Sequence, residues 1–424
     1  MIAALTALLA AARVVTLDQA LQSARERQPQ LRQAQAAYEA AAARQSQARA
    51  PMLPQVSAIA SYQRTTDNSI SKPGAPITPG QGGSSFSTLP SLSDNISASM
   101  LLFDFGATPN RYRAARAQAE AARDSEQATA LQVDFNVRAA YFDARANKAL
   151  VGVAEETLAN QQRHLDQTEG FVQAGTHPEI DLVQARTDTA NARVQLINTQ
   201  NAYEQSKVTL NAAMGILGPT NYDVGDESLL PLLDEDDPTG DRLFEEASKG
   251  RPEVAALEQQ VRASQLTATA LRGQYGPSLS ANAGFTQAGE SLYRLGWNAS
   301  FGLTLSWQIF QGGLTNAEVQ EAEANVANAL AQLDLQRQQI RSDIDSARLA
   351  VRAAKATISA TQEALTNARV RLQLAEQRYE VGVGSAIELG DAQVALTQAA
   401  AQAVQADDRL ATARAQLLRA VGRR

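Results

Sequence analysis

The sequence predicts a mainly α-helical protein whose chain also supplies four strands to a transmembrane β-barrel. Three observations support this prediction. Long tracts rich in Ala, Gln, Glu and Arg contain no proline, four shorter segments alternate apolar and polar residues, and the two halves of the 424-residue chain correspond to each other. Aromatic residues make up only 5% of the chain, so we expect thin helix-on-helix packing rather than a thick globular core.

The two halves of the chain carry the same motifs in the same order. Two proline pairs are 223 positions apart (252 − 29), namely Pro29 with Pro252 and Pro54 with Pro277. Three later pairs are 207 positions apart (310 − 103), namely Phe103 with Phe310, Gly175 with Gly382 and Gly215 with Gly422. The first half therefore carries 16 extra residues (223 − 207), which we assign to the Gly-, Pro- and Ser-rich segment TTDNSISKPGAPITPGQGGSSFSTLP.

This correspondence predicts two structural repeats, residues 13–217 and 242–424, joined by an acidic connector at 218–241. Residues 1–12 are apolar and end in three alanines, a pattern typical of a secretory signal peptide. No basic residue precedes the apolar run, so whether this signal peptide is complete stays open. The run Asp234 to Asp237 offers carboxylates to a hard cation, but it lacks the loop pattern of a calcium site, and we expect a solvated connector.

Each repeat begins with a helical stretch, at about 16–50 and 240–272, and later contains a long proline-free tract, at about 110–169 and 316–380. At 1.5 Å per residue, each tract of roughly 60 residues would span about 90 Å as one helix. Helices of this length suit a coiled-coil-like assembly better than a compact domain. A closed ring of helices and a long antiparallel hairpin are both compatible with the pattern.

Four segments alternate in the manner of β-strands, at about 53–66, 93–105, 277–288 and 296–310. The last has a wholly apolar face, made of Trp297, Ala299, Phe301, Leu303, Leu305, Trp307 and Ile309. Alternation of this kind suits either a half-buried strand in a soluble sheet or a strand of a transmembrane barrel. The only two tryptophans of the chain are ten positions apart (307 − 297), which favours membrane-interface aromatics at both ends of one membrane-spanning strand.

Four strands cannot close a barrel, and an open sheet edge in lipid leaves backbone N–H and C=O groups unpaired. The sequence therefore predicts an oligomer. Two copies would give eight strands with a filled interior, whereas three would give twelve with room for a water-filled lumen. The Ser, Gly, Asn and Thr residues on the polar faces favour the wider pore.

Composition excludes several other classes of protein. The net charge is −7 with dispersed basic residues, so nucleic acid is not an expected partner. The absence of cysteine excludes disulfides, thiolate metal sites and a cysteine-linked lipid anchor. The two histidines, His164 and His177, have no metal-ligand spacing, and the chain has no nucleophile elbow, phosphate loop or dinucleotide fingerprint. We therefore expect no catalytic residues, no cofactor and no metal, and we expect His177 to be exposed beside Pro178.

The chain resembles the TolC-like outer-membrane efflux proteins, also called outer membrane factors. The likeness covers nearly the whole sequence, and it includes VTLDQALQSARERQPQL, the strand entries LPQVS and GPSLS, the strand exits LFDFG and IFQGG, and two repeated helix turns. It implies a homotrimer with a twelve-stranded barrel in the outer membrane of a Gram-negative bacterium and a trimeric α-barrel tunnel of antiparallel helices in the periplasm.

The resemblance further implies a passive exit channel of a tripartite efflux or type I secretion system. Its partners would be a periplasmic adaptor (membrane fusion protein), an inner-membrane transporter of the RND, ABC or MFS type, and outer-membrane lipid. A periplasmic coiled-coil tether without a pore remains the alternative, although it leaves the four alternating segments unexplained.

The same resemblance implies that the two helix turns contact the adaptor. The residues of these turns are Ala174, Gly175, Thr176, Val381, Gly382 and Val383. A periplasmic aperture would lie just beyond them, at positions Asp181, Tyr379, Glu388 and Asp391. Three-fold symmetry would convert each acidic residue into a ring of carboxylates, which favours cations. Gly384 stands where the family carries a basic residue that ties neighbouring helices together, and Arg378 and Arg186 are the candidates to replace that residue.

Overall fold

The computed structural model describes residues 13–66, 88–228 and 240–423. The predicted signal peptide, the acidic run at 234–237 and most of the predicted first-repeat loop lie outside these residues. The chain forms two compact units, which we describe separately. One unit comprises Tyr38–Ala122 and Leu257–Gln332 and contains the long strands, while the remainder of the chain forms a helical unit. No helix among the described residues is long and apolar enough to cross a membrane.

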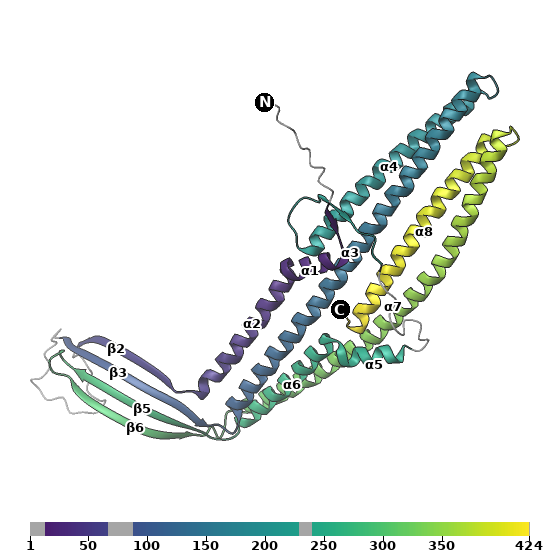
Figure 1. Ribbon diagram of the computed structural model, residues 1–424. Coiled ribbons are helices and arrows are strands. Elements are labelled where there is room, and N and C mark those ends of the chain that lie inside the picture. The colour runs from purple at the N-terminus through teal and green to yellow at the C-terminus, as the bar shows by residue number, and fades with distance from the viewer. Residues whose placement is uncertain (1–12, 67–87, 229–239, 424) are drawn as a thin grey trace, which may run out of the picture. The chain divides into compact units, whose positions relative to one another are not determined.

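The first unit contains a four-stranded antiparallel sheet in the order β2-β3-β5-β6 (Figure 1). Its strands are β2 (Gln55–Thr66), β3 (Thr88–Phe103), β5 (Ser278–Gly289) and β6 (Gly296–Ser306), and a 3₁₀ turn at Ala50–Met52 leads into β2. The two strands of repeat one thus pair with the two strands of repeat two through β3 and β5. The predicted four strands and two-fold repeat are confirmed.

The two faces of this sheet differ in chemistry. One face exposes large apolar side chains, for example 71% of Trp297, 79% of Phe301 and 61% of Leu303. On the other face, short polar side chains pair across the strands, with the hydroxyl oxygens of Ser57 and Ser97 2.9 Å apart and those of Ser61 and Ser93 2.7 Å apart. Asn282 likewise donates to Thr304 at 3.1 Å. The sheet therefore has one apolar and one hydrogen-bonding face, and both are exposed within a single chain.

The sequence misplaced some strand ends. The fourth strand ends at Ser306 rather than at residue 310, so Trp307 lies just beyond the strand instead of at its last position. Its indole Nε1 donates to the carbonyl of Tyr275 at 3.0 Å. This side-chain contact takes the place of backbone pairing between β5 and β6, which ends at Ser306. The second strand also begins earlier than predicted, at Thr88 rather than at 93, because β2 offers a paired neighbour for each residue from Thr88 onward.

The two strand-to-helix exits turn alike although their residues differ. Phe105 and Gly106 have φ values of +51° and +83°, and the corresponding Gly312 and Gly313 have +63° and +89°. A non-glycine residue at positive φ is strained. The ring of Phe105 packs over Gly276, where a Cβ atom would come within 2.4 Å of it, and this contact offsets part of the strain.

Two antiparallel helical hairpins make up most of the helical unit (Figure 1), and the first residues of their long helices, up to Ala122 and Gln332, belong to the first unit. The first hairpin contains α3 (Ala107–Gln173) and α4 (Glu179–Met214), and the second contains α7 (Leu314–Glu380) and α8 (Ala386–Val421). Both α3 and α7 have 67 residues and both α4 and α8 have 36, so the repeat is visible in helix length as well as in sequence.

The helical stretches predicted at 16–50 and 240–272 are each broken into two helices. They form α1 (Leu17–Arg27) with α2 (Pro29–Arg49), and α5 (Asp241–Gly250) with α6 (Pro252–Gly273). In both cases the break falls directly before a proline, because proline disfavours a helical residue ahead of it and suits the first position of a new helix. In both repeats, the single helical stretch that the sequence predicted is therefore two helices.

The described first part of the connector, residues 218–228, contains a short strand that the sequence did not predict. Its residues Tyr222–Val224 form β4, which pairs in parallel with β1 (Arg13–Val15). The nearby core includes the fully buried side chains of Tyr141, Phe142 and Leu210. The Nζ atom of Lys148 forms an ion pair with a carboxylate oxygen of Asp223 in the connector, at 2.8 Å. Strands of three residues are too short to give a recognisable alternation, so the sequence indicated only a solvated connector.

Candidate functional site at the helix turns

The two helix turns have matching backbone hydrogen bonds. In the first, Gly175 N donates to Val172 O and Thr176 N to Phe171 O, each at 3.0 Å. In the second, Gly382 N donates to Tyr379 O and Val383 N to Arg378 O, again at 3.0 Å. This pair of bonds is the Schellman ending of a helix, which needs a residue at positive φ, and Gly175 and Gly382 have φ values of +72° and +76°.

The residue that follows this ending differs between the repeats. The first has His177, which is only partly exposed and whose ring stacks on Phe171 at 4.9 Å. The second has Gly384, whose backbone N–H donates to Arg378 O at 2.8 Å. A Cβ at Gly384 would lie 3.0 Å from backbone atoms of Arg378 and Tyr379. The backbone would therefore crowd any side chain at position 384, including the basic one that the resemblance implies. His177, which the sequence predicted to be exposed, is partly exposed.

Four aromatic rings, which we name the aromatic clasp, join the two hairpins close to these turns. They belong to His164, Phe171, His177 and Tyr379. The Tyr379 ring lies 5.2 Å from His164, 5.3 Å from His177 and 6.2 Å from Phe171, measured between centroids. Tyr379 is 2% exposed and also packs in an apolar cluster with Leu372 and Leu389. It is the predicted aperture residue that the structure buries most deeply.

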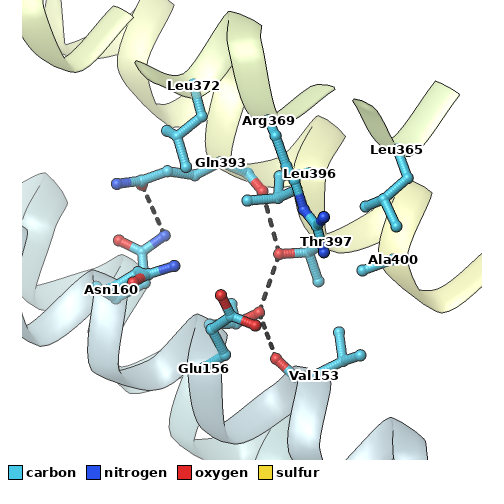
Figure 2. A pocket seen from close by; sticks show the side chains of 12 residues that line it. Val153, Glu156, Asn160, Leu365, Arg369, Leu372, Gln393, Leu396, Thr397 and Ala400 are labelled. Atoms are coloured by element: carbon cyan, nitrogen blue, oxygen red, sulfur yellow. Dashed lines mark hydrogen bonds between the residues drawn. The ribbon is translucent and has the colours of Figure 1, made fainter. Parts of the chain in front are cut away.

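Polar side chains continue the contact between the hairpins beyond the clasp. Gln161 on α3 donates to Gln393 on α8 at 2.9 Å, and the hydroxyl oxygens of Thr157 and Thr397 are 3.1 Å apart. They border a small cavity of about 30 Å³. Figure 2 shows Gln393, Leu396 and Thr397 facing the α3 residues around it. Gln161 and Gln393 are both buried, so the two hairpins meet here along a polar seam, defined by these four residues.

The predicted acidic aperture residues lie on two different surfaces. Asp181 and Asp391 line a groove of about 800 Å³ between α4 and α8, together with Asp188 and several amide side chains. Glu388 does not line this groove, and its carboxylate lies 3.4 Å from the guanidinium of Arg378. Arg186 instead lies 3.8 Å from Glu169. Of the two candidates to replace the basic lock residue, Arg378 is the one that contacts a predicted aperture carboxylate.

Burial controls the electrostatics of His164. Desolvation lowers the pKa of this imidazole, and the nearby carboxylates of Asp188 and Asp181 oppose the shift without cancelling it. Its Nδ1 atom and the hydroxyl of Tyr379 are buried without a hydrogen-bond partner among the described residues. At neutral pH the clasp is therefore uncharged at His164.

A second titratable group, Asp408 on α8, lies elsewhere in the helical unit. Burial raises the pKa of Asp408 to about 6, and the negative charges of Asp143 and Asp407 add to the effect. Arg145 lowers it in part, and its guanidinium also pairs with Asp407. No group of three or more His, Cys, Asp or Glu side chains among the described residues is arranged to hold a metal ion.

Sequence reasoning missed the partners of Tyr379. His164 and Phe171 are on α3, more than two hundred positions before Tyr379, and no local pattern marks them. The polar seam was also missed, since Thr157, Gln161, Gln393 and Thr397 look like ordinary polar residues of exposed helices. Their heptad-like spacing, with Thr157, Gln161 and His164 at successive steps of four and three, was the available signal.

The structure combines two hairpins that end in paired helix turns with an amphipathic sheet of four strands, and comparison with known proteins assigns this combination to a class. A family model described as "Outer membrane efflux protein" matches residues 20–216 and 243–423. The chain belongs to this family. It is accordingly a TolC-like protein of the Gram-negative outer membrane that extends into the periplasm.

Individual relatives agree with this placement. The chain is 26% identical over 311 residues to the cation efflux system protein CusC of Escherichia coli, covering 72% of this chain and 67% of that protein. It is 26% identical over 396 residues to the pyoverdine export outer membrane protein OpmQ of Pseudomonas putida, covering 90% and 80%.

Solved structures show the same fold. A crystal structure of CusC superposes with a TM-score of 0.84 at 22% identity, covering 96% of this chain and 92% of that one. The outer membrane protein VceC of Vibrio cholerae superposes with a TM-score of 0.82 at 20% identity, covering 96% of both chains. The predicted fold class is thereby confirmed.

Proposed function

We propose that three copies of this chain form a passive exit channel of an export system. Each copy would supply four strands to a twelve-stranded barrel in the outer membrane and two helical hairpins to a tunnel in the periplasm. A periplasmic adaptor and an inner-membrane transporter would deliver the cargo. The chain itself carries out no catalysis in this proposal, in keeping with relatives that are channel proteins.

The main support for this proposal is the four-stranded sheet. Its apolar face exposes Trp297, Phe301 and Leu303, which suits contact with lipid, while its opposite face carries hydroxyl and amide pairs, which suit a water-filled lumen. Among the described residues, β2 and β6 each have one unpaired edge. Unpaired edges in lipid are costly, so closure with further copies satisfies them. Trp297 and Trp307 would lie at the membrane interfaces.

The adaptor is proposed to contact the two helix turns, at Ala174 to Thr176 and Val381 to Val383. Both turns are exposed, and Val381 and Val383 each have 72% of their surface accessible. Exposed valines at the end of a hairpin provide an apolar surface for a partner helix. The relatives' names mention cations, solvents and pyoverdine, so they do not single out one cargo or one transporter class for this chain.

The aperture is proposed to lie at Tyr379, Asp181, Glu388 and Asp391, with the carboxylates favouring cations. Neutralising the acidic residues should therefore raise anion permeability. We expect Asp391→Asn to have a larger effect than Glu388→Gln, because Arg378 already offsets part of the charge of Glu388. Reversal potentials in asymmetric salt would measure the change. Unchanged selectivity in both variants would show that these residues do not line the constriction.

The channel proposal is tested with the full chain purified in detergent. We expect a trimer by light scattering corrected for bound detergent, and discrete single-channel currents in planar bilayers. A monomeric, detergent-independent rod that gives no current would contradict the channel and support a periplasmic tether.

A further inference from the structure

The only two histidines of the chain lie against the same tyrosine ring. His164 comes from α3 and His177 from the first helix turn, and both contact Tyr379 of α7, with centroids 5.2 and 5.3 Å away. The ring planes of His164 and Tyr379 are inclined by 69°, an edge-to-face contact. The histidines of this protein are thus concentrated at one junction between the two hairpins.

The surroundings of His164 do not stabilise a positive charge well. The side chain is largely buried, and its Nδ1 lacks a hydrogen-bond partner among the described residues. On α7 it faces Tyr379, whose own buried hydroxyl has no hydrogen-bond partner among the described residues. On α8, Leu389 and Ala392 complete the apolar cluster around Tyr379. The charged groups whose fields reach His164 are Asp188 and Asp181, both on α4.

Protonation of His164 would place a cation at this junction. Burial already lowers the pKa of His164 while the hairpins are together. If the hairpins part, the imidazole regains water and its pKa returns toward the ordinary value of about 6.5. Above that value both states are neutral and the proton has no effect. Below it, the parted state binds the proton more tightly, so acid favours parting.

The neighbouring polar seam lowers the cost of such a movement, which also exposes the buried ring of Tyr379. Gln161 with Gln393, and Thr157 with Thr397, are hydrogen-bonded pairs that water can replace when the hairpins separate. An apolar seam of the same size would lose its burial instead. The junction therefore combines one titratable contact with contacts that exchange readily with solvent.

We propose that His164 is a pH-sensing group of the aromatic clasp, and that its protonation in an acidified periplasm separates the α3/α4 hairpin from the α7/α8 hairpin and opens the channel. This inference rests on the proposed channel function. Asp181 and Asp188 moderate the response, since their negative charges stabilise protonated His164 while the clasp is closed. His177, which lies partly exposed in the turn, is not the sensor.

The test compares single-channel open probability of the full-length protein at pH 7.5 and pH 5.5. In the unmodified protein we expect a rise on the order of several-fold, because acid favours the parted state, in which the imidazole of His164 is hydrated. His164→Phe keeps an aromatic ring against Tyr379 and should abolish the rise. His164→Asn, which removes the ring but also cannot titrate, should abolish it too.

Two controls separate His164 from the other histidine and from a buried carboxylate. His177→Phe removes the other histidine, and Asp408→Asn removes the carboxylate whose pKa is about 6. Both variants should keep the acid response. Because the chain has only two histidines, imidazole NMR of the isotope-labelled protein gives two sets of signals, which His177→Phe assigns.

The outcomes separate failure of this inference from failure of the channel. Currents that are present but equal at both pH values would overturn the sensing role and leave the channel intact. An acid response that survives in both His164 variants would do the same, as would NMR signals of His164 that stay unchanged over this range. Absence of current from every variant at either pH would contradict the proposed channel itself.

Discussion

The two helix turns share one backbone ending but stabilise it differently. In the first repeat, His177 follows the ending and packs its ring on Phe171. In the second, the equivalent Gly384 brings the backbone into contact with the end of α7, and Ser385 caps α8 by accepting from Glu388 N at 3.2 Å. The first turn thus depends on side-chain stacking, and the second on close backbone approach.

This difference shows how a duplicated hairpin can acquire an asymmetric junction. Position 379 carries a tyrosine that the second repeat buries, whereas the equivalent position in the first repeat, Val172, is only partly buried. The first repeat contributes the two histidines and Phe171, and the second contributes the ring that they surround. The two repeats therefore keep the same backbone geometry while their side chains take different roles in the aromatic clasp.

Among these substitutions, Tyr379→Ala is expected to lower the free energy of unfolding most. Removing a buried aromatic side chain costs about 3 to 5 kcal/mol, which should loosen both turns. Limited proteolysis around residues 378–385 and thermal unfolding would measure it. Tyr379→Phe is the matched control and should be nearly neutral, because the hydroxyl has no hydrogen-bond partner to lose. Val172→Ala, the equivalent change in the first repeat, should cost about 1 kcal/mol or less. Equal losses for Tyr379→Ala and Val172→Ala would contradict the asymmetry.

Gly384→Ala is expected to lower the free energy of unfolding by less than Tyr379→Ala does. Its Cβ would lie 3.0 Å from backbone atoms of Arg378 and Tyr379, and backbone cannot yield as a flexible side chain does, so we expect a cost of about 1 to 3 kcal/mol. Gly390→Ala is the control within α8, where nothing lies within 4 Å. It should be neutral or stabilising by up to about 1 kcal/mol. If both changes had the same effect on the thermal transition, close approach at Gly384 would not be what shapes this turn.

Next in size is the loss of the helix cap in Ser385→Ala, which should cost about 1 kcal/mol. The first repeat has Pro178 at the equivalent position, where no side-chain cap is made. Pro178→Ser should therefore gain a cap but lose the rigidity of proline, for a net change within about 0.5 kcal/mol. Hydrogen exchange at the first turns of α4 and α8 would measure both. Faster exchange in α4 than in α8 after Ser385→Ala would argue against a stabilising role for this cap.

The smallest effect on stability is expected for Arg378→Ala. The ion pair with Glu388 is more than two-fifths exposed on both sides, and such pairs contribute about 0 to 1 kcal/mol. Arg186→Ala, which removes the looser pair with Glu169, provides the comparison. We expect only Arg378→Ala to raise cation selectivity, since it uncovers the charge of Glu388. A matching change in Arg186→Ala would show that long-range charge, and not this pair, sets the selectivity.

The sequence predicted the features that local chemistry determines. Gly175 and Gly382 indicated helix endings at positive φ, and the alternation around Phe301 indicated a strand. It failed where the partner is distant: His164 contacts a tyrosine far along the chain, and Tyr222–Val224 pairs with Arg13–Val15 in strands too short to recognise. Trp307 leaves its strand because of a tertiary contact with Tyr275, which no periodicity reveals.

Separation of the two hairpins is tested most directly by joining them covalently. The chain has no cysteine, and the hydroxyl oxygens of Thr157 and Thr397 are 3.1 Å apart, so Thr157→Cys with Thr397→Cys places two thiols across the polar seam. With disulfide formation verified by loss of thiol labelling, we expect oxidation to suppress opening at pH 5.5 and a reductant to restore it, while Thr157→Cys alone is unaffected. Equal opening of the oxidised and reduced double variant would contradict separation of the hairpins as the opening step.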